Sequence, residues 1–167
     1  VVFASVATAI TIPFAYVVAS TATYTKRIGG FIQSATSLPI VVSAVTLGFG
    51  IIVTFNRSPF DWRASTWLLP IVHALVALPL VVHILTPALR AMSPMQREAA
   101  QTLGASQFKV WWHIDVQHMR RPLVAGAAMS FAVSLGEFGA TSFLTRSSST
   151  TLPIAISQLL GRPGTLL

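Results

Sequence analysis

Residues 1–25 read VVFASVATAITIPFAYVVASTATYT, a stretch without a single charged side chain. A helix needs about 20 mostly apolar residues to cross the hydrocarbon core of a bilayer, and this stretch is long enough to do so. Pro13 is expected to kink the helix, because proline removes one of its backbone hydrogen bonds. The stretch therefore predicts an α-helical membrane protein.

The composition of the whole chain agrees with a membrane location. Of its 167 residues, 53% are hydrophobic and 9% are charged, and the mean hydropathy is +0.71, whereas a soluble domain carries about a quarter charged residues. The net charge of +7 comes from basic residues that lie between apolar runs, which indicates membrane topology and not nucleic-acid binding. The chain has no cysteine, which excludes disulfides and thiol chemistry.

Three further apolar runs follow, the first two of them uncharged, and polar segments separate them. The runs cover residues 28–55, 66–89 and 122–144. We expect bends or close helix contacts at Pro39, Gly48 and Gly50, and breaks at Pro70 and Pro79. A later apolar stretch, residues 152–160, is too short to span and is expected to lie in the interface or to re-enter.

The distribution of Lys and Arg predicts how the chain is oriented. One side holds Lys26, Arg27, Arg90, Arg97, Lys109, Arg120 and Arg121, and the other holds Arg57, Arg63, Arg146 and Arg162. The side richer in Lys and Arg usually faces the cytoplasm. The long polar segment, residues 90–121, is therefore expected to be cytoplasmic, and the short loop at residues 56–65 lies on the opposite side.

The long polar segment contains the signals of a short helix and of a second one after it. Ser93 and Gln96 have the S-x-x-Q spacing of a capping box, and Pro94 occupies the first helical position. Gly104 supplies a stop at the carboxyl end. Ser106 can cap the second helix. These signals alone are also compatible with a solvated linker between two spans.

The same residues resemble the EAA signature of the permease subunits of binding-protein-dependent ABC importers. Glu98-Ala99-Ala100 is followed after three residues by Gly104, and after nine more by Ile114. The resemblance implies an all-α, polytopic membrane helical bundle of the MetI-like type, with about four spanning helices here and a cytoplasmic coupling helix-turn-helix. The implied ATPase-coupling residues are Glu98, Ala99, Ala100, Leu103, Gly104, Ala105 and Ile114.

The resemblance also implies partners in a multi-pass complex of the cell inner membrane. These are a dimer of ABC ATPase subunits, an extracytoplasmic substrate-binding protein, and a second permease half or subunit within the lipid bilayer. The chain has no G-x-x-x-x-G-K-[ST] motif for nucleotide phosphates. ATP hydrolysis is therefore expected in a separate subunit, and this chain is expected to be no enzyme, with no catalytic residue, metal or cofactor.

Two later stretches narrow the resemblance. SLGEFGATSFL, residues 134–144, and TLPIAISQLLGRPG, residues 151–164, look like the thiamine and iron(III) branch, and molybdate permeases share GEFGAT. Iron(III) or thiamine is the expected substrate, with molybdate- or sulfate-type oxyanions as the alternative. Residues 1–167 are expected to form one permease domain whose final spanning helix follows Leu167. The family's hydrophobic-Pro pair is replaced by Val116-Gln117.

Glu137 is the only ionisable residue in the fourth apolar run, residues 122–144. On a continuous helix it shares one small and polar face with Gly126, Ser130, Ser134 and Thr141. Such a face usually turns toward other helices or a water-filled path. The sequence leaves two roles open: Glu137 lines a translocation path or gate with these hydroxyls, or it hydrogen-bonds to neighbouring groups and fixes helix packing.

Two other classes of function compete with the importer permease. An ion-coupled secondary carrier would use Glu137 to bind protons or sodium. An intramembrane enzyme would need Glu137 at the same depth as His73 or His83. The histidines lack the spacing of a helical metal pair and are expected to pack in the interior or at the interface. The EAA spacing favours the permease over both alternatives.

Overall fold

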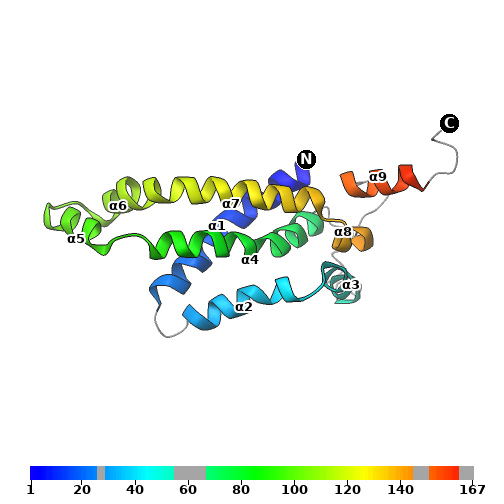
Figure 1. Ribbon diagram of the computed structural model, residues 1–167, viewed down its shortest axis with the longest axis horizontal. Helices are drawn as coiled ribbons and strands as arrows, with labels where there is room; N and C mark the ends of the chain where they lie inside the picture. Colours follow the sequence, from blue (N-terminus) through cyan, green and yellow to red (C-terminus); the bar gives the residue numbers. More distant parts are fainter. Residues whose placement is uncertain (26–28, 55–66, 145–150, 162–167) are drawn as a thin grey trace.

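The computed structural model describes residues 1–25, 29–54, 67–144 and 151–161. In these ranges the regular structure is helical, as the all-α prediction requires, and Figure 1 shows an elongated bundle with α5 and α6 at one end and α9 at the other. The helices, together with the π-helical turn η1, are α1 (Val2–Tyr24), α2 (Gly29–Val41), α3 (Ala44–Thr54), α4 (Leu68–Arg90), α5 (Pro94–Thr102), α6 (Gln107–Val110), η1 (Trp111–Asp115), α7 (Val116–Gly136), α8 (Gly139–Leu144) and α9 (Leu152–Leu160).

Three helical stretches of the described residues are long and apolar enough to cross a membrane. They are α1, α4 and the stretch from Gln107 to Ser142 that contains α7. The second uncharged run is not one straight helix, because α2 and α3 meet at 91° and count at most as one broken span. The total is three or four spans, in agreement with the prediction. The predicted loop at residues 56–65 lies outside the described residues.

The centre of the bundle consists of α1, α4 and α7, which pack against one another, with α2 alongside α1 and α4. Helix α1 buries small side chains, which allow neighbouring helices to approach closely. These are Ala4, Ala7, Thr11, Ala15, Ala19 and Ala22. Larger side chains fill the space beside them, namely Val81, Val82, Leu85 and Leu89 of α4 and Met119 of α7.

The prolines interrupt the helices less than predicted. Helix α1 continues through Pro13, and α4 continues through both Pro70 and Pro79, so the expected breaks in the third run are wrong. Pro70 lies in the first turn of α4, where backbone N–H groups have no hydrogen-bond partner within the helix. A proline at this position therefore removes no helical hydrogen bond. Pro79 is fully buried, and the packing of α4 against α1 and α7 keeps the helix continuous there.

The fourth apolar run, residues 122–144, differs from the prediction at both ends. Helix α7 begins upstream of Pro122, which lies inside it, and it ends at Gly136. Glu137 has an extended backbone, with φ −71° and ψ 109°, and α8 begins only at Gly139. Glycine is a poor helix former, so the two glycines favour a break here. The expected continuous helix through Glu137 is therefore wrong.

Helix α8 packs with its backbone directly against α3. A Cβ atom added at Gly48 would lie 2.8 Å from the Cα atom of Ala140, which is closer than real side chains allow. Gly50, two residues later, has open space around the corresponding position. Of the two glycines predicted to permit bending or close contact, Gly48 is thus the one that makes the contact.

Candidate functional site

Helices α5 and α6 form a hairpin that projects from one end of the bundle (Figure 1). Pro94 occupies the first position of α5, as predicted, and Ser93 is the N-cap residue. The Ser93 hydroxyl makes no capping hydrogen bond, so the predicted capping box with Gln96 is wrong. Both side chains are exposed, and water can hydrogen-bond the first N–H groups instead. Ser106 does cap α6, because its hydroxyl accepts from the Lys109 N–H at 3.4 Å.

Gly104 forms the turn between the two helices. Its φ of +82° lies in the left-handed region that side chains with a Cβ disfavour. The Gly104 N–H donates to the Gln101 carbonyl at 2.9 Å, and the Ala105 N–H donates to the Ala100 carbonyl at 3.0 Å. This pair of bonds is a Schellman motif, which satisfies carbonyls at the end of a helix. The predicted stop at Gly104 is confirmed.

The hairpin exposes its side chains, and α5 buries none of them. Glu98 and Ala99 are exposed, while Ala100 is half-buried. Large apolar side chains are also open to the outside, with Leu103 88% exposed and Met95 75% exposed. Six of the seven predicted coupling residues lie in α5 or its turn, and Ile114 follows in η1. Their geometry is that of an uncovered, partly apolar surface.

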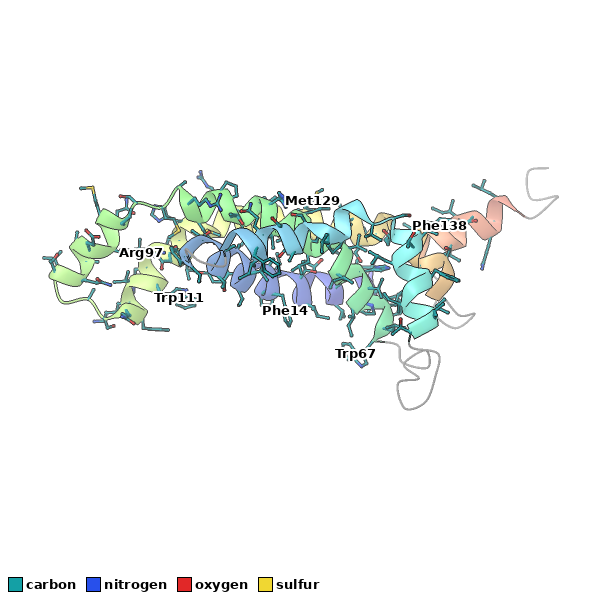
Figure 2. The ribbon with its side chains drawn as sticks, turned by 90° about the horizontal axis from the view of Figure 1, so that it is seen from below. Phe14, Trp67, Arg97, Trp111, Met129 and Phe138 are labelled. Atoms are coloured by element: carbon teal, nitrogen blue, oxygen red, sulfur yellow. The ribbon has the colours of Figure 1, made fainter. Side chains whose placement is uncertain are left out.

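Arg97 differs from its neighbours on α5 because it reaches back to the bundle. Its Nε donates to Asp115 Oδ1 at 2.8 Å, and its Nη2 donates to the Tyr24 hydroxyl at 2.6 Å. Figure 2 shows Arg97 at the same end as Trp111, far from Trp67 and Phe138. Burial alone would lower the pKa of the guanidinium, but the hydrogen bonds to Tyr24 and Asp115 raise this pKa above its ordinary value.

Sequence reasoning assigned no role to Asp115 or Tyr24, and it assigned Arg97 only to topology. Arg97 is 18 positions from Asp115 and 73 positions from Tyr24. These contacts depend on how the hairpin folds back, so spacing along the chain does not predict them. Asp115 closes the π-helical turn η1, and α7 follows without interruption through Val116-Gln117. The segment in which the family pattern has a proline thus leads directly into a membrane-spanning helix.

A buried polar cluster lies at the other end of α7. His73 of α4 is only 2% exposed. Its Nδ1 lies 2.6 Å from Ser134 Oγ, and its Nε2 lies 2.9 Å from Thr141 Oγ1. The Thr141 hydroxyl donates to the Glu137 carbonyl at 2.8 Å. Since that proton is already used, Nε2–H donates to Thr141 and Nδ1 accepts from Ser134.

Glu137 itself caps the start of α8. Its Oε1 accepts from the Ala140 N–H at 2.9 Å. Ser130, Ser134 and Thr141 are buried, whereas Glu137 is only half-buried. The Ser130 hydroxyl is buried without a hydrogen-bond partner among the described residues. The structure thus brings the four predicted path residues to one region, but it shows Glu137 in the packing role that the sequence left open.

The geometry does not support the intramembrane-enzyme hypothesis. His73 reaches Glu137 only through Thr141 and the main-chain carbonyl, not through the carboxylate. His83 is exposed and bonds to the Pro79 carbonyl of its own helix at 2.8 Å. Sequence reasoning assigned His73 a packing role and did not connect it to Ser134 and Thr141, because sequence alone does not place α4 beside α7.

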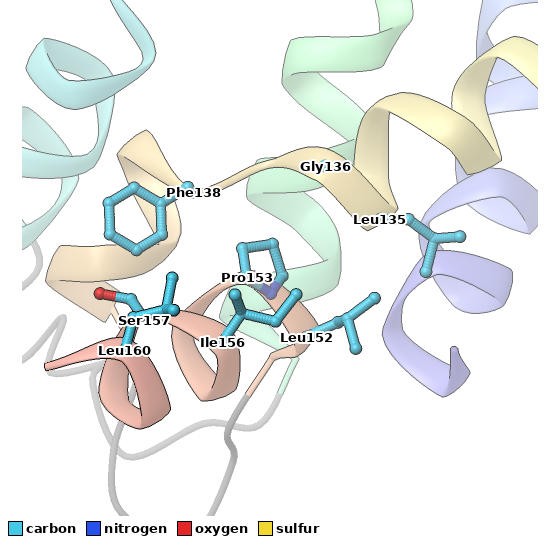
Figure 3. A pocket seen from close by; sticks show the side chains of 8 residues that line it. All are labelled: Leu135, Gly136, Phe138, Leu152, Pro153, Ile156, Ser157 and Leu160. Atoms are coloured by element: carbon cyan, nitrogen blue, oxygen red, sulfur yellow. The ribbon is translucent and has the colours of Figure 1, made fainter. Parts of the chain in front are cut away.

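An apolar pocket of about 580 Å³ lies beside the break between α7 and α8 (Figure 3). On one side it is lined by Leu135, Gly136 and Phe138, and on the other by residues of α9, namely Leu152, Pro153, Ile156, Ser157 and Leu160. Its lining offers a single hydroxyl. The pocket therefore lies between α9 and the end of α7 and lacks the groups that would hold a charged substrate.

A family model for inner membrane components of binding-protein-dependent transport systems matches residues 11–162. The chain belongs to this family, the permease subunits of ABC importers. Together with the apolar helices of the bundle, this membership identifies a multi-pass protein of the inner membrane.

Individual relatives are permeases of sulfate and molybdenum transport systems. The chain is 31% identical to the sulfate transport system permease protein CysW of Synechocystis sp., over 75% of this chain and 50% of the relative. It is 30% identical to the molybdenum transport system permease protein ModB of Escherichia coli K12, over 80% of this chain and 64% of the relative. It is 34% identical to the sulfate transport system permease protein CysT of the same strain, over 65% of this chain and 41% of the relative.

The chain thus spans about half to just under two-thirds of the length of the first two relatives. The matches support the importer permease that the EAA resemblance predicted. They do not support the thiamine and iron(III) branch, since these relatives belong to the oxyanion alternative.

Proposed function

We propose that this chain forms the membrane path of an ABC importer and that a separate ATPase dimer drives it through the α5–α6 hairpin. The observation that carries the proposal is the hairpin itself. It projects beyond the bundle, buries no side chain of α5, and presents Glu98, Ala99 and Leu103 to the outside. An uncovered surface of this kind, with large apolar side chains among polar ones, is typical of a site where another protein binds.

The small residues of the hairpin fit this role. Ala99 and Ala100 leave room for a partner's side chains to approach the helix closely, and nothing lies within 4 Å of a Cβ atom at Gly104. We assign residues 90–121 to the cytoplasmic side, where an ATPase can reach them. Motion of the ATPase would then be passed from α5 to the spans that precede and follow it. A substrate-binding protein would deliver the substrate on the opposite side.

We assign the gate to the break between α7 and α8. Here His73 connects Ser134 and Thr141, and Glu137 caps α8. The break lies at the end of the bundle opposite to the hairpin (Figure 1). Helix α8 is short and is held by His73, by the Glu137 cap and by its contact with α3. A short helix held by a few polar contacts can move without unfolding the central bundle.

We propose a tetrahedral oxyanion, such as sulfate or molybdate, as the substrate. The names of the relatives support this class. The proposal replaces the iron(III) and thiamine expectation. We propose that a second permease subunit or half completes the path, as the family resemblance implies.

Cross-linking tests the coupling part of the proposal. Residues 1–167 contain no cysteine, so Ala100→Cys introduces the single thiol of this stretch, and it is paired with a cysteine in the cleft of the co-expressed ATPase. We expect a cross-link whose yield changes with ATP. Failure to cross-link, with both proteins folded and assembled in the membrane, would refute docking at α5.

Uptake tests the substrate and the energy source. We expect labelled sulfate or molybdate to accumulate in cells that express the complete transporter, and ATP depletion to stop this accumulation. Uptake of iron(III) or thiamine instead would overturn the oxyanion proposal. Uptake that survives ATP depletion but stops when the ion gradient is collapsed would replace the importer with the carrier alternative.

A further inference from the structure

The docking hairpin needs a connection that fixes its direction relative to the bundle. Helix α5 buries no side chain, so hydrophobic packing does not hold it. A flexible connection would absorb the motion of a bound partner instead of passing it on. The contacts that Arg97 makes with Tyr24 and Asp115 supply a rigid connection.

These contacts join three separate elements. Tyr24 is the last residue of α1, Arg97 lies in the middle of α5, and Asp115 ends the π-helical turn before α7. The guanidinium carbon also lies 5.0 Å from the centre of the Tyr24 ring, within the range of a cation–π interaction. One side chain of the hairpin therefore contacts the ends of two of the three central helices.

The burial of the pair distinguishes it from an ordinary surface ion pair. The Asp115 side chain is 10% exposed and that of Arg97 is 28% exposed. Exposed pairs contribute little because water screens them, whereas removing one partner from a buried pair leaves an uncompensated charge. Loss of the Arg97 guanidinium would therefore leave the Asp115 carboxylate buried without a counter-charge. Arg97–Asp115 is the only ion pair among the described residues.

The π-helical turn sets the direction of Asp115. Its hydrogen bonds link residues five apart, so the side chains that follow it point differently from those of a regular α-helix. Such turns occur often at functional sites. In this chain the turn ends with a buried carboxylate that accepts a hydrogen bond from the docking helix.

We propose that Arg97 is the positioning residue of the docking segment: by binding Tyr24 and Asp115 it makes α5 move as one body with the ends of α1 and α7. This inference rests on the proposed docking of an ATPase at α5. It adds a specific route by which docking is converted into movement of the spanning helices, namely through α1 and α7 together.

The test compares transport per ATP hydrolysed in the full-length transporter, reconstituted with its ATPase and supplied with labelled sulfate or molybdate. Arg97→Gln should lower this ratio by about fivefold or more, which is a common size for coupling between sites, while ATP hydrolysis continues. Tyr24→Phe keeps the aromatic ring and removes only the hydroxyl acceptor, and it should lower the ratio less. Arg120→Gln removes one positive charge from an exposed position of α7 and is the matched control.

Docking is measured separately through the Ala100→Cys cross-link. If Arg97→Gln still cross-links and keeps the wild-type ratio, the positioning role is wrong and docking stands. If Ala100→Cys with Arg97 intact does not cross-link, the proposed function has failed. If Arg97→Gln does not assemble, Tyr24→Phe tests the positioning role instead. An unchanged ratio of transport to ATP hydrolysis in that variant would overturn the proposal.

A second measurement reports the connection directly. Spin labels at Gln101 of α5 and Gln117 of α7, both exposed, should give a narrow distribution of distances in the wild-type complex. The distribution should broaden in Arg97→Gln and stay narrow in Arg120→Gln. Equal widths in both variants would show that the hairpin is held by other contacts.

Discussion

The imidazole Nδ1 of His73 lies 2.6 Å from the hydroxyl of Ser134, which joins α4 to α7 inside the membrane-spanning bundle. The other ring nitrogen continues the connection to Thr141 of α8. A single buried side chain therefore links three helices. Two of these, α7 and α8, lie on opposite sides of the break at Glu137. This arrangement makes the histidine a structural element of the proposed gate.

Replacement of His73 by alanine should destabilise the bundle and release α8. The substitution removes two interhelical hydrogen bonds, each worth about 0.6–1.7 kcal/mol in a membrane protein. We expect the unfolding free energy to fall by about 1–3 kcal/mol, in line with two buried hydroxyls that lose their partner. Unfolding of the purified protein by denaturing detergent measures this change.

His83→Ala is the matched control for that experiment. It makes the same chemical change on the same helix, but His83 is exposed and bonds only to the Pro79 carbonyl one turn away. Its effect should be smaller than about 0.5 kcal/mol, as for most exposed substitutions. Equal destabilisation by both variants would contradict the linking role of His73.

Substitutions of Glu137 separate its packing role from a role of its charge. Glu137→Gln keeps an oxygen that can accept from the Ala140 N–H, so α8 should remain capped and uptake should stay close to wild type. Glu137→Ala removes the cap, which costs about 0.5–2 kcal/mol in other helices, and should lower uptake. Loss of uptake in Glu137→Gln, with normal assembly, would show that the carboxylate charge is required.

Two substitutions of Gly104 separate backbone strain from bulk at the docking surface. Both Gly104→Ala and Gly104→Leu place a Cβ on a residue with φ of +82°, at a cost of about 1–2 kcal/mol. Only leucine adds a large side chain at the turn, where it would block seating in the ATPase. We expect Gly104→Leu to insert normally but to abolish transport, and Gly104→Ala to retain most of it. Transport in the leucine variant would count against docking at this turn.

The contact between α3 and α8 can be tested with two glycines of one helix. Gly48→Ala forces a methyl group to within 2.8 Å of the Ala140 backbone, and overpacking of this kind costs about 1–3 kcal/mol. Gly50→Ala meets no atom within 4 Å and should be neutral or stabilising. Thermal unfolding in detergent distinguishes the two, and equal melting temperatures would contradict the packing of α8 on α3.

Much of the fold could be predicted because apolar length alone determines where helices cross a membrane. The runs at residues 1–25 and 66–89 became α1 and α4 with small shifts at their ends. The prolines were misleading, because the cost of Pro79 depends on neighbours that sequence alone does not place. The break at Glu137 lies between Gly136 and Gly139, and these flanking glycines predict a loosened helix. They do not predict that the helix ends there, because a helical pattern can be drawn through a glycine-flanked residue whether or not the helix continues.

The candidate sites show the same difference between features that depend on nearby residues and contacts between distant helices. Local signals correctly indicated Pro94 and Gly104, because a helix start and a left-handed turn depend on residues close together in the chain. The contacts of Arg97 and His73 could not be predicted, because each joins helices that are distant in sequence. The coupling and path residues remain proposals that the experiments above address.

The exposed hairpin has a consequence for the life of the protein before its complex is assembled. Without the proposed ATPase, the subunit presents Met95 and Leu103 on a helix with no buried side chain, and segments with few buried apolar contacts open more often than the core does. Proteases and chaperones act on such transiently open, apolar segments. We therefore expect the amount of this subunit in the cell to follow the synthesis of its ATPase, with unassembled copies removed soon after insertion.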